Sequence, residues 1–300
     1  MVVKTVADAI RTEELSKRFG DVLALDQLNL TVERGEVFGF LGPNGAGKST
    51  TIRLLLHLIR PSAGRAWLMG VPVQDVARAH RHIGYVSGDV ALWPQLTGIE
   101  TLRLLGNLSG GVNEAYRDEL LERLELDPSR RIRTLSKGNR QKVALVAALM
   151  NQPDVLLFDE PTAGLDPLKE AEFQQIVREA AGRGQTVFLS SHILDEVEDI
   201  CTRVAILRSG RLVAVSTLDE LRHKGVTVFD VMLDGPVPSF VGVAGVVAEQ
   251  LVEGGVRLSV SGSPKALLAE LGRQRVVSLR SREPDLEEVF LSYYGVADRR

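Results

Sequence analysis

A glycine-rich segment in the first third of the chain has the residue types needed to hold phosphate. It reads GPNGAGKST and fits the pattern G-x-x-x-x-G-K-[S/T]. Glycines let the backbone wrap closely with positive φ angles, so that successive N–H groups point at phosphate oxygens. The lysine supplies a cation, and the serine hydroxyl is a hard oxygen ligand suited to Mg²⁺. The predicted phosphate contacts are Gly42, Pro43, Asn44, Gly45, Ala46, Gly47, Lys48, Ser49 and Thr50.

Two carboxylates follow an apolar run in the middle of the chain. Residues 155–158 read VLLF, which is typical of a buried parallel strand, and Asp159 and Glu160 come directly after it. At the carboxyl end of such a strand, Asp159 can bind a metal ion at the phosphate loop. Glu160 points differently and can orient or deprotonate a water that attacks a γ-phosphate. The alternative is a pair that only caps the loop before Pro161.

One histidine completes the predicted site. His192 follows the next apolar run, residues 186–189, so its ring is expected beside the acid pair, where it can hydrogen-bond a γ-phosphate and the attacking water. Capping of a helix is the competing interpretation, and the acid pair one strand earlier favours function. We therefore predict Glu160 and His192 as catalytic residues, and Ser49 with Asp159 as metal ligands.

The elements that must position these residues alternate between strands and helices. Period-two alternation at Leu28, Leu30 and Val32 predicts a strand, and the apolar positions Phe173, Ile176, Val177 and Ala180 predict an amphipathic helix. Other strands are expected at 37–41, 155–158, 186–189, 203–208 and 211–216, and other helices at 48–58, within 98–126 (two), and at 137–150. Such alternation predicts a mostly parallel sheet covered by helices.

The pattern changes after about residue 226. Short strands and hairpin-like turns at Asp234-Gly235 and Gly254-Gly255 are expected, then a helix at 264–271, a strand at 276–279 and a last helix at 284–294. We predict two domains, residues 1–222 and a small α+β domain at 223–300.

Composition limits the class of protein. Hydrophobic residues make up 44% and charged residues 25%, which is ordinary for a globular chain with a sizeable core. A net charge of −3 gives no broad positive field, so no nucleic-acid partner is expected. A single cysteine, Cys201, fits a reducing cytosol. The longest uncharged stretch, 235–248, is too short to span a bilayer, and residues 1–18 lack the apolar block of a signal peptide.

Further motifs stand in a fixed order around the predicted site. LSKGN at 135–139 opens the helix before the acid pair, GLDP at 164–167 follows the pair, and Phe19 precedes the glycine-rich loop. With the loop, the acid pair and Ser191-His192, these segments resemble the motifs of ATP-binding cassette ATPases over about residues 11–220. LSKGN is similar to the family signature L-S-G-G-Q, and Phe19 stands where the family places an aromatic ring that stacks on adenine.

The resemblance implies a fold and a mechanism. The fold is an α/β P-loop NTPase cassette, whose mostly parallel core carries an antiparallel β subdomain and a helical signature subdomain. ATP and Mg²⁺ are bound and ATP is hydrolysed. Ser136 and Gly138 bind the γ-phosphate of an ATP held by the opposite subunit, and Asp166 lies across that interface, in a homodimer or heterodimer. An integral membrane permease subunit is the implied partner, at the cytoplasmic face of the cell membrane.

Three positions depart from the family pattern. Lys137 replaces a glycine and Asn139 replaces a glutamine of the signature. Gly88 stands where the family usually has a glutamine that completes the metal site and contacts the membrane subunit; Asp89 or water are the candidate substitutes. The segment around Trp93 is still expected to contact the membrane partner, with core packing of Trp93 as the alternative.

Three sequence segments resemble one branch of the family. The segments are LSKGNRQK, LTGIE at 96–100 and PDLEEVFL at 284–291. They are similar to the corresponding segments of members that are encoded apart from their permease. Many of these members export drugs, antibiotics or lipids, including the daunorubicin-resistance type. We expect an exporter ATPase. A soluble regulatory, translation or repair ATPase is the alternative, and a single cassette without heptad repeats disfavours it. Dimer contact, regulation or simple stabilisation stay open for the C-terminal region.

Overall fold

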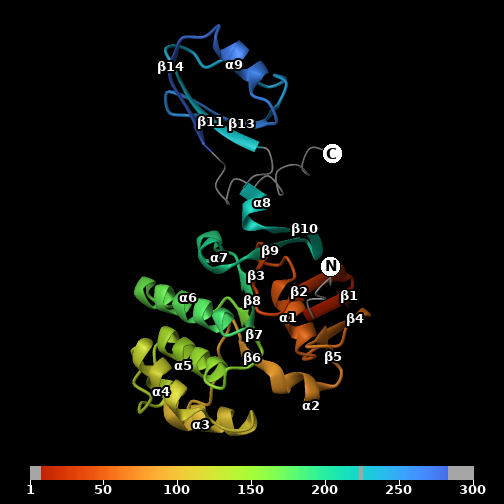
Figure 1. Cartoon of the computed structure of the whole chain (residues 1–300), viewed down its shortest axis with the longest axis vertical. Coiled ribbons are helices and arrows are strands. Elements are labelled where there is room, and N and C mark those ends of the chain that lie inside the picture. The colour runs from red at the N-terminus through yellow and green to blue at the C-terminus, as the bar shows by residue number, and fades with distance from the viewer. Residues whose placement is uncertain (1–7, 223–225, 283–300) are drawn as a thin grey trace, which may run out of the picture. The chain divides into compact units, whose positions relative to one another are not determined.

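The computed structural model describes residues 8–222 and 226–282 (Figure 1). The chain divides into two compact units, Met1–Val215 and Ser216–Arg300. Each contains a hydrophobic core of its own. The domain limits 1–222 and 223–300 stay a prediction, because compactness does not test whether either part folds alone.

A six-stranded sheet forms the centre of the first unit. Its order is β10-β9-β3-β8-β7-β6, and β9, β3, β8, β7 and β6 pair in parallel. The strands are β3 (Val37–Leu41), β6 (Ile83–Val86), β7 (Val155–Asp159), β8 (Thr186–Ser191), β9 (Arg203–Arg208) and β10 (Arg211–Thr217). Every residue of β3, β7 and β8 is buried, as expected for central parallel strands. The predicted parallel core is confirmed.

An antiparallel sheet packs against this core. It has the order β2-β1-β4-β5, with β1 (Asp8–Phe19), β2 (Val22–Glu33), β4 (Ala63–Leu68) and β5 (Val71–Pro72). Leu28, Leu30 and Val32 of β2 lie in the same core cluster as Phe38 and Phe40 of β3. The alternation read from the sequence therefore marks the buried face of β2, and the cluster joins the two sheets.

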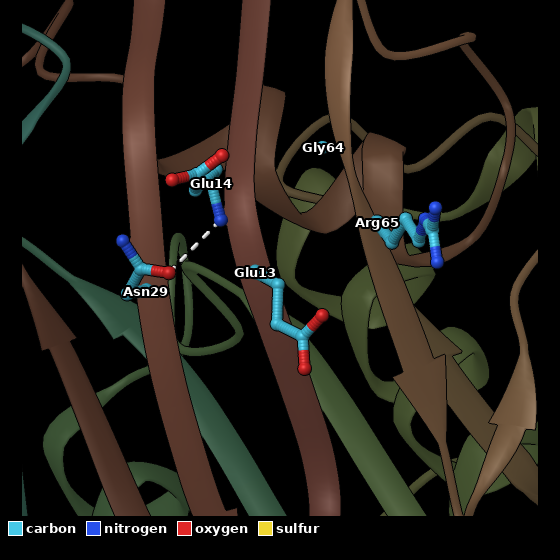
Figure 2. Close-up of a pocket in the computed structure, with 5 residues that line it drawn as sticks. All are labelled: Glu13, Glu14, Asn29, Gly64 and Arg65. Carbon is cyan, nitrogen blue, oxygen red and sulfur yellow. Dashed lines mark hydrogen bonds between the residues drawn. The ribbon is translucent and has the colours of Figure 1, made fainter.

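A polar hollow of about 580 Å³ lies on the antiparallel sheet between β1, β2 and β4 (Figure 2). It is lined by Glu13, Glu14, Asn29, Gly64 and Arg65. A Cβ atom at Gly64 would lie 2.3 Å from the Glu14 carbonyl oxygen, so only glycine permits this approach of β4 to β1. None of the predicted site residues lines the hollow.

Helices flank the sheets of the first unit. They are α1 (Lys48–Leu55), α2 (Val76–Ala79), α3 (Gly98–Leu108), α4 (Glu114–Arg123), α5 (Lys137–Leu149), α6 (Pro167–Gly182) and α7 (Leu194–Ile200), with short 3₁₀ turns at His80–His82 and Ile132–Thr134. Figure 1 shows α3, α4, α5 and α6 gathered in one helical region. Helix α1 ends at Leu55, three residues before the predicted limit, because the chain turns into a left-handed conformation at His57 (φ 51°).

Helices α4 and α6 are joined by an ionic cluster. The Arg123 guanidinium contacts the carboxylates of Glu172 and Glu179, each at 2.6 Å. Lys169 of α6 pairs with Glu125, just past α4, at 2.7 Å. Hydrogen bonds from Arg123 lower the pKa of the Glu179 carboxyl below its usual value. These contacts fix the helical region to the helix that follows the acid pair.

The second unit contains an antiparallel sheet and two described helices. The sheet order is β12-β13-β11-β14, with β11 (Val226–Leu233), β12 (Val246–Val252), β13 (Gly255–Ser261) and β14 (Val276–Arg282), and the helices are α8 (Leu218–Arg222) and α9 (Lys265–Leu271). Leu267 and Leu271 of α9 pack into the core of this sheet. The small α+β architecture agrees with the prediction, and the helix expected at 284–294 lies outside the described residues.

One predicted hairpin is correct and one is wrong. Gly254 (φ 74°) turns the chain from β12 into β13, which pair in antiparallel. Asp234-Gly235 instead opens a long connection from β11 to β12, and β11 pairs with β13 and β14. Pro236 and Pro238 follow this turn, and because proline has no N–H to donate, they prevent an immediate return strand.

The only cysteine of the chain is enclosed. Cys201 follows α7 and is 7% exposed. Burial raises the pKa of its thiol far above the usual range. Within residues 8–222 and 226–282, none of the helices has the length and apolar character required to cross a membrane.

Candidate functional site

The glycine-rich loop connects β3 to α1, as the sequence predicts. A Cβ atom at Gly42 would lie 2.6 Å from the Leu207 carbonyl oxygen, and one at Gly47 (φ 111°) would lie 2.6 Å from the carbonyl oxygen of Ala24. The Gly210 N–H donates to the Ala46 carbonyl at 2.9 Å. The loop is thus held tightly against β2 and the β9–β10 turn, while Pro43, Asn44 and Gly45 stay exposed at the amino end of α1. This conformation suits a phosphate group.

Lys48 is a buried cation inside the loop. Its side chain is 5% exposed, and Nζ donates to the Gly42 carbonyl at 2.6 Å and lies 3.7 Å from Oε1 of Glu160. Burial lowers the pKa of Lys48, and the nearby Glu160 and Asp159 carboxylates oppose this shift. Because this cation is withdrawn from water, an anionic ligand such as a phosphate would strongly stabilise its charged form.

The predicted metal ligands lie together. Ser49 Oγ donates to Oδ1 of Asp159 at 3.1 Å, and Ser190 Oγ donates to the same oxygen at 2.6 Å. Asp159 is 6% exposed. A hydroxyl and a carboxylate are the hard oxygen donors that Mg²⁺ prefers, and Mg²⁺ commonly completes its shell with water and substrate phosphates. The donor set therefore fits Mg²⁺.

Asp159 and Glu160 point to different partners. Glu160 has left-handed backbone angles (φ 50°), and its N–H donates to the Ser190 carbonyl at 3.0 Å. This turn directs the Glu160 carboxylate toward Lys48 and toward His192, whose Nδ1 lies 3.1 Å from Oε1. Both side chains are partly open to solvent. The two carboxylates of the acid pair thus have different surroundings: Asp159 lies beside two hydroxyls, and Glu160 lies beside Lys48 and His192.

Ser136, Gly138 and Asp166 form a separate group. Ser136 Oγ caps α5 by accepting from the Asn139 N–H at 3.2 Å. The Asp166 carboxylate caps α6. A Cβ atom at Gly138 would lie 2.3 Å from the carbonyl oxygen of Gly164, so α5 begins in direct contact with the segment before α6. In the part of the chain that is described, no hydrogen bond or ion pair joins these three residues to Lys48, Ser49 or Glu160.

Phe19 and Trp93 are exposed aromatic side chains. Phe19 ends β1 and is 49% exposed, with Nζ of Lys17 over its ring at 4.8 Å from the centroid. Lys17 also donates to the Arg60 carbonyl at 2.7 Å, which fixes the ammonium over the ring. Trp93 is 47% exposed, so the alternative of core packing for Trp93 is wrong.

Gly88 lies beside the acid pair. A Cβ atom at this position would lie 3.2 Å from the Asp159 carbonyl oxygen. The segment after β6 therefore approaches the predicted metal site, although the residue there has no side chain to offer.

Two residues of the site were not predicted. Ser190 bonds Asp159, and Gln141 of α5 donates from Nε2 to the Pro161 carbonyl at 2.7 Å while only 1% exposed. The Ser190-Ser191 pair before His192 was the available signal for the first. Gln141 carries no local signal, because its partner is twenty residues away.

A phosphate loop between a parallel strand and a helix, with a lysine, a serine and an acid pair converging on it, defines a P-loop nucleoside triphosphatase. A sequence model of the ABC transporter family matches residues 25–163. The daunorubicin resistance ATP-binding protein DrrA3 of Streptomyces coeruleorubidus is 38% identical, over 97% of this chain and 97% of its own length. The chain belongs to the ATP-binding proteins of ABC transporters.

Two further comparisons agree with this assignment. The Nod factor export ATP-binding protein I of Cupriavidus pinatubonensis is 35% identical, over 98% of this chain and 93% of its own length. A dimeric ATP-binding cassette in a post-hydrolysis state, bound to ADP and phosphate, superposes with a TM-score of 0.63 at 26% identity, over 70% of this chain and 98% of the cassette. The protein is an ABC ATPase that binds and hydrolyses ATP.

Proposed function

We propose that this ATPase works in pairs and drives a separate integral membrane permease, as an exporter at the cytoplasmic face of the cell membrane. The observation that carries the pairing is the division of the predicted site into two groups. Lys48, Ser49 and the acid pair converge, whereas Ser136 and Gly138 lie elsewhere on the chain without a polar contact to them. A second cassette supplies the missing group to each site.

The roles within one site follow from the contacts. Lys48 and the backbone N–H groups of its loop bind the β- and γ-phosphates. Ser49 and Asp159 hold Mg²⁺, which when bound neutralises phosphate charge. Glu160 orients or deprotonates the attacking water, and His192, 3.1 Å from its carboxylate, steadies that water and the γ-phosphate. Phe19 offers an exposed ring face for adenine.

The opposite cassette completes the site in this proposal. Ser136 Oγ and the N–H groups at the start of α5 face the γ-phosphate, since a helix amino end binds anions. Asp166 lies across the interface. ATP then favours the closed pair only because closure adds phosphate contacts that the open pair lacks. Loss of the γ-phosphate removes those contacts and lets the pair open.

Coupling to a permease is supported by exposed apolar side chains. Trp93, before α3, is 47% exposed, and Leu104 and Leu108 on α3 are 37% and 74% exposed. Apolar groups open to water are typical of a protein–protein contact. With Gly88 in place of a longer side chain, this segment is left to contact the permease through Trp93 and its neighbours. Export is supported by the names of relatives that match almost the whole chain, a daunorubicin resistance protein and a Nod factor export protein.

The substitution Glu160→Gln tests the catalytic assignment. Turnover should be abolished while ATP still binds, because the amide keeps the shape and loses the base. Size-exclusion chromatography with Mg·ATP should show a nucleotide-bound dimer. Glu13→Gln, the same change on the exposed surface of β1, should leave turnover unchanged. Near-normal hydrolysis by the Glu160 variant would remove Glu160 from its role, and a monomer under these conditions would contradict pairing.

The permease is tested by affinity purification from detergent-solubilised membranes. A protein with about six membrane-spanning helices, recognisable by hydropathy, should be recovered with the chain and should change its ATPase rate in lipid vesicles. A Trp93→Ala variant should recover less of it while hydrolysing ATP normally on its own. Equal recovery by both forms would contradict the proposed contact.

A further inference from the structure

Glu196 is a buried carboxylate on α7 that has none of the roles proposed above for the ATP site. It is 6% exposed and accepts two hydrogen bonds. Thr162 Oγ1 donates to one oxygen at 2.5 Å, and Ser191 Oγ donates to the other at 2.8 Å. Within the described ranges no lysine, arginine or histidine forms an ion pair with it. Because a buried charge is costly unless hydrogen-bonded, these two hydroxyls account for its presence in the fold.

The two hydroxyls belong to the two segments that carry the predicted catalytic groups. Thr162 is two residues after Glu160, and Ser191 directly precedes His192. Nδ1 of His192 lies 3.1 Å from Oε1 of Glu160. The Glu196 carboxylate therefore joins, through Thr162 and Ser191, the same two segments whose Glu160 and His192 side chains are in contact.

Besides the contacts of the Glu160 side chain, three hydrogen bonds hold the loop after β7 in place. The Glu160 N–H donates to the Ser190 carbonyl, Gln141 donates to the Pro161 carbonyl, and Thr162 bonds Glu196. The first two contacts involve the backbone, so neither depends on a side chain of the loop. Of these three contacts, only the Thr162–Glu196 bond uses a loop side chain, and it links the loop to α7. The Glu160 side chain makes separate contacts, to Lys48 and His192.

We propose that Glu196 is a positioning residue for ATP hydrolysis, which holds the Glu160 loop against the His192 turn by accepting hydrogen bonds from Thr162 and Ser191. The inference rests on the proposed roles of Glu160 and His192. For water to attack, the reacting groups must stay close to their productive positions. A misplacement of about 1 Å can lower the rate on the order of 100-fold. Among the described residues, no hydrogen bond or ion pair joins Glu196 to the phosphate loop or to Phe19, so we expect ATP binding not to depend on it.

The carboxylate acts through hydrogen bonding rather than charge. In a Glu196→Gln variant, the amide oxygen still accepts from Ser191, and the amide N–H₂ can donate to Thr162 Oγ1 once that hydroxyl rotates. Glu196→Ala removes both bonds and leaves two buried hydroxyls without this partner. We call the pair of hydrogen bonds from Thr162 and Ser191 to Glu196 the clamp. The two variants therefore distinguish an effect of losing these hydrogen bonds from an effect of losing the negative charge.

The experiment measures kcat and the ATP dissociation constant of full-length variants. Glu196→Ala should lower kcat about tenfold or more, with ATP affinity within about threefold of the parent protein. Glu196→Gln should restore most of kcat. Thr162→Val should lower kcat, and should add little in the Glu196→Ala background because both remove the same bond. Asp195→Ala, an exposed acid in the same helical turn, is the matched control and should not lower kcat.

Several results would overturn the proposal. These are a parental kcat for Glu196→Ala, an equal loss in Asp195→Ala, an equal loss in Glu196→Gln, or a loss of ATP affinity in place of kcat. If Glu196→Ala does not fold, Thr162→Val decides: a lower kcat at unchanged affinity supports the clamp, and an unchanged kcat rejects it. Glu160→Gln is assayed alongside, so retained turnover there marks a failure of the Glu160 assignment and not of the clamp.

Discussion

The start of α5 offers a sharp test of how the signature segment is positioned. In Gly138→Ala, the new Cβ atom would lie 2.3 Å from the Gly164 carbonyl oxygen, well under an ordinary contact, and a backbone oxygen cannot rotate away. Alanine gains about 1 kcal/mol over glycine from helix propensity. Overpacking against a fixed neighbour costs about 1–3 kcal/mol. The expected net change therefore runs from about zero to 2 kcal/mol of lost stability.

The matched control is Gly182→Ala. Gly182 is the last residue of α6, and a Cβ atom there meets nothing within 4 Å. This variant should gain up to about 1 kcal/mol, so the two alanine variants should differ by about 1–3 kcal/mol. In a unit of this size, 1 kcal/mol corresponds to about 2–4 °C in Tm, so the gap should reach several degrees.

Activity provides the second measurement. Separation of α5 from Gly164 moves Ser136 relative to Asp166, so the steady-state ATPase rate of Gly138→Ala should fall about tenfold or more while its phosphate loop still binds ATP. Gly182→Ala should keep the parental rate. The reasoning is refuted if Gly138→Ala is as stable as Gly182→Ala and hydrolyses ATP at the parental rate.

Three further variants test other parts of the molecule. Lys48→Ala should weaken ATP binding more than tenfold by calorimetry without lowering Tm, because burial already lowers the pKa of this lysine and its removal relieves that cost; tight binding would contradict the phosphate-loop assignment. Phe19→Ala should weaken ATP binding about 5- to 150-fold, the value of one base stacked on an aromatic ring, and unchanged affinity would remove Phe19 from the site. Hydrogen bonds from Arg123 lower the pKa of Glu179 below its ordinary 4.5, so its stabilising contribution is present above that pH and is lost as pH falls through the lowered pKa. The Tm difference between the parent and Glu179→Gln should therefore be largest near neutral pH and should disappear in acid. A difference that does not depend on pH would rule out the ion pair as its cause.

Local patterns were sufficient for the elements that carry the site. β3 and β7 are short apolar runs that are buried at every position, and Ser136 marks the start of α5 as an ordinary helix cap. β1 was not recognised, because its alternation is broken by a left-handed residue at Glu14 and by shifts in its register with β2. The hairpin prediction at Asp234-Gly235 is wrong, because a turn signal does not specify which strand pairs next.

In the candidate site, too, local sequence patterns predict the residues within motifs but not the contacts between distant segments. Lys48, Ser49 and Asp159 lie in contiguous motifs whose spacing encodes their contacts, and the structure brings them together. Glu196 reaches Thr162 across 34 residues, and no local pattern distinguishes it from the acidic neighbours on its helix. Its burial depends on how α7 packs, which is a property of the folded chain.

The enclosed thiol of Cys201 has a practical consequence. Thiol reagents attack the thiolate, and a buried group with a strongly raised pKa offers almost none of it near neutral pH. We therefore expect the chain to behave toward thiol reagents as if it contained no cysteine. A cysteine introduced at an exposed position should therefore be the single site for a fluorophore, spin label or cross-linker. Labels at such a position would test the proposed pairing of two cassettes through a turnover cycle without first removing native residues.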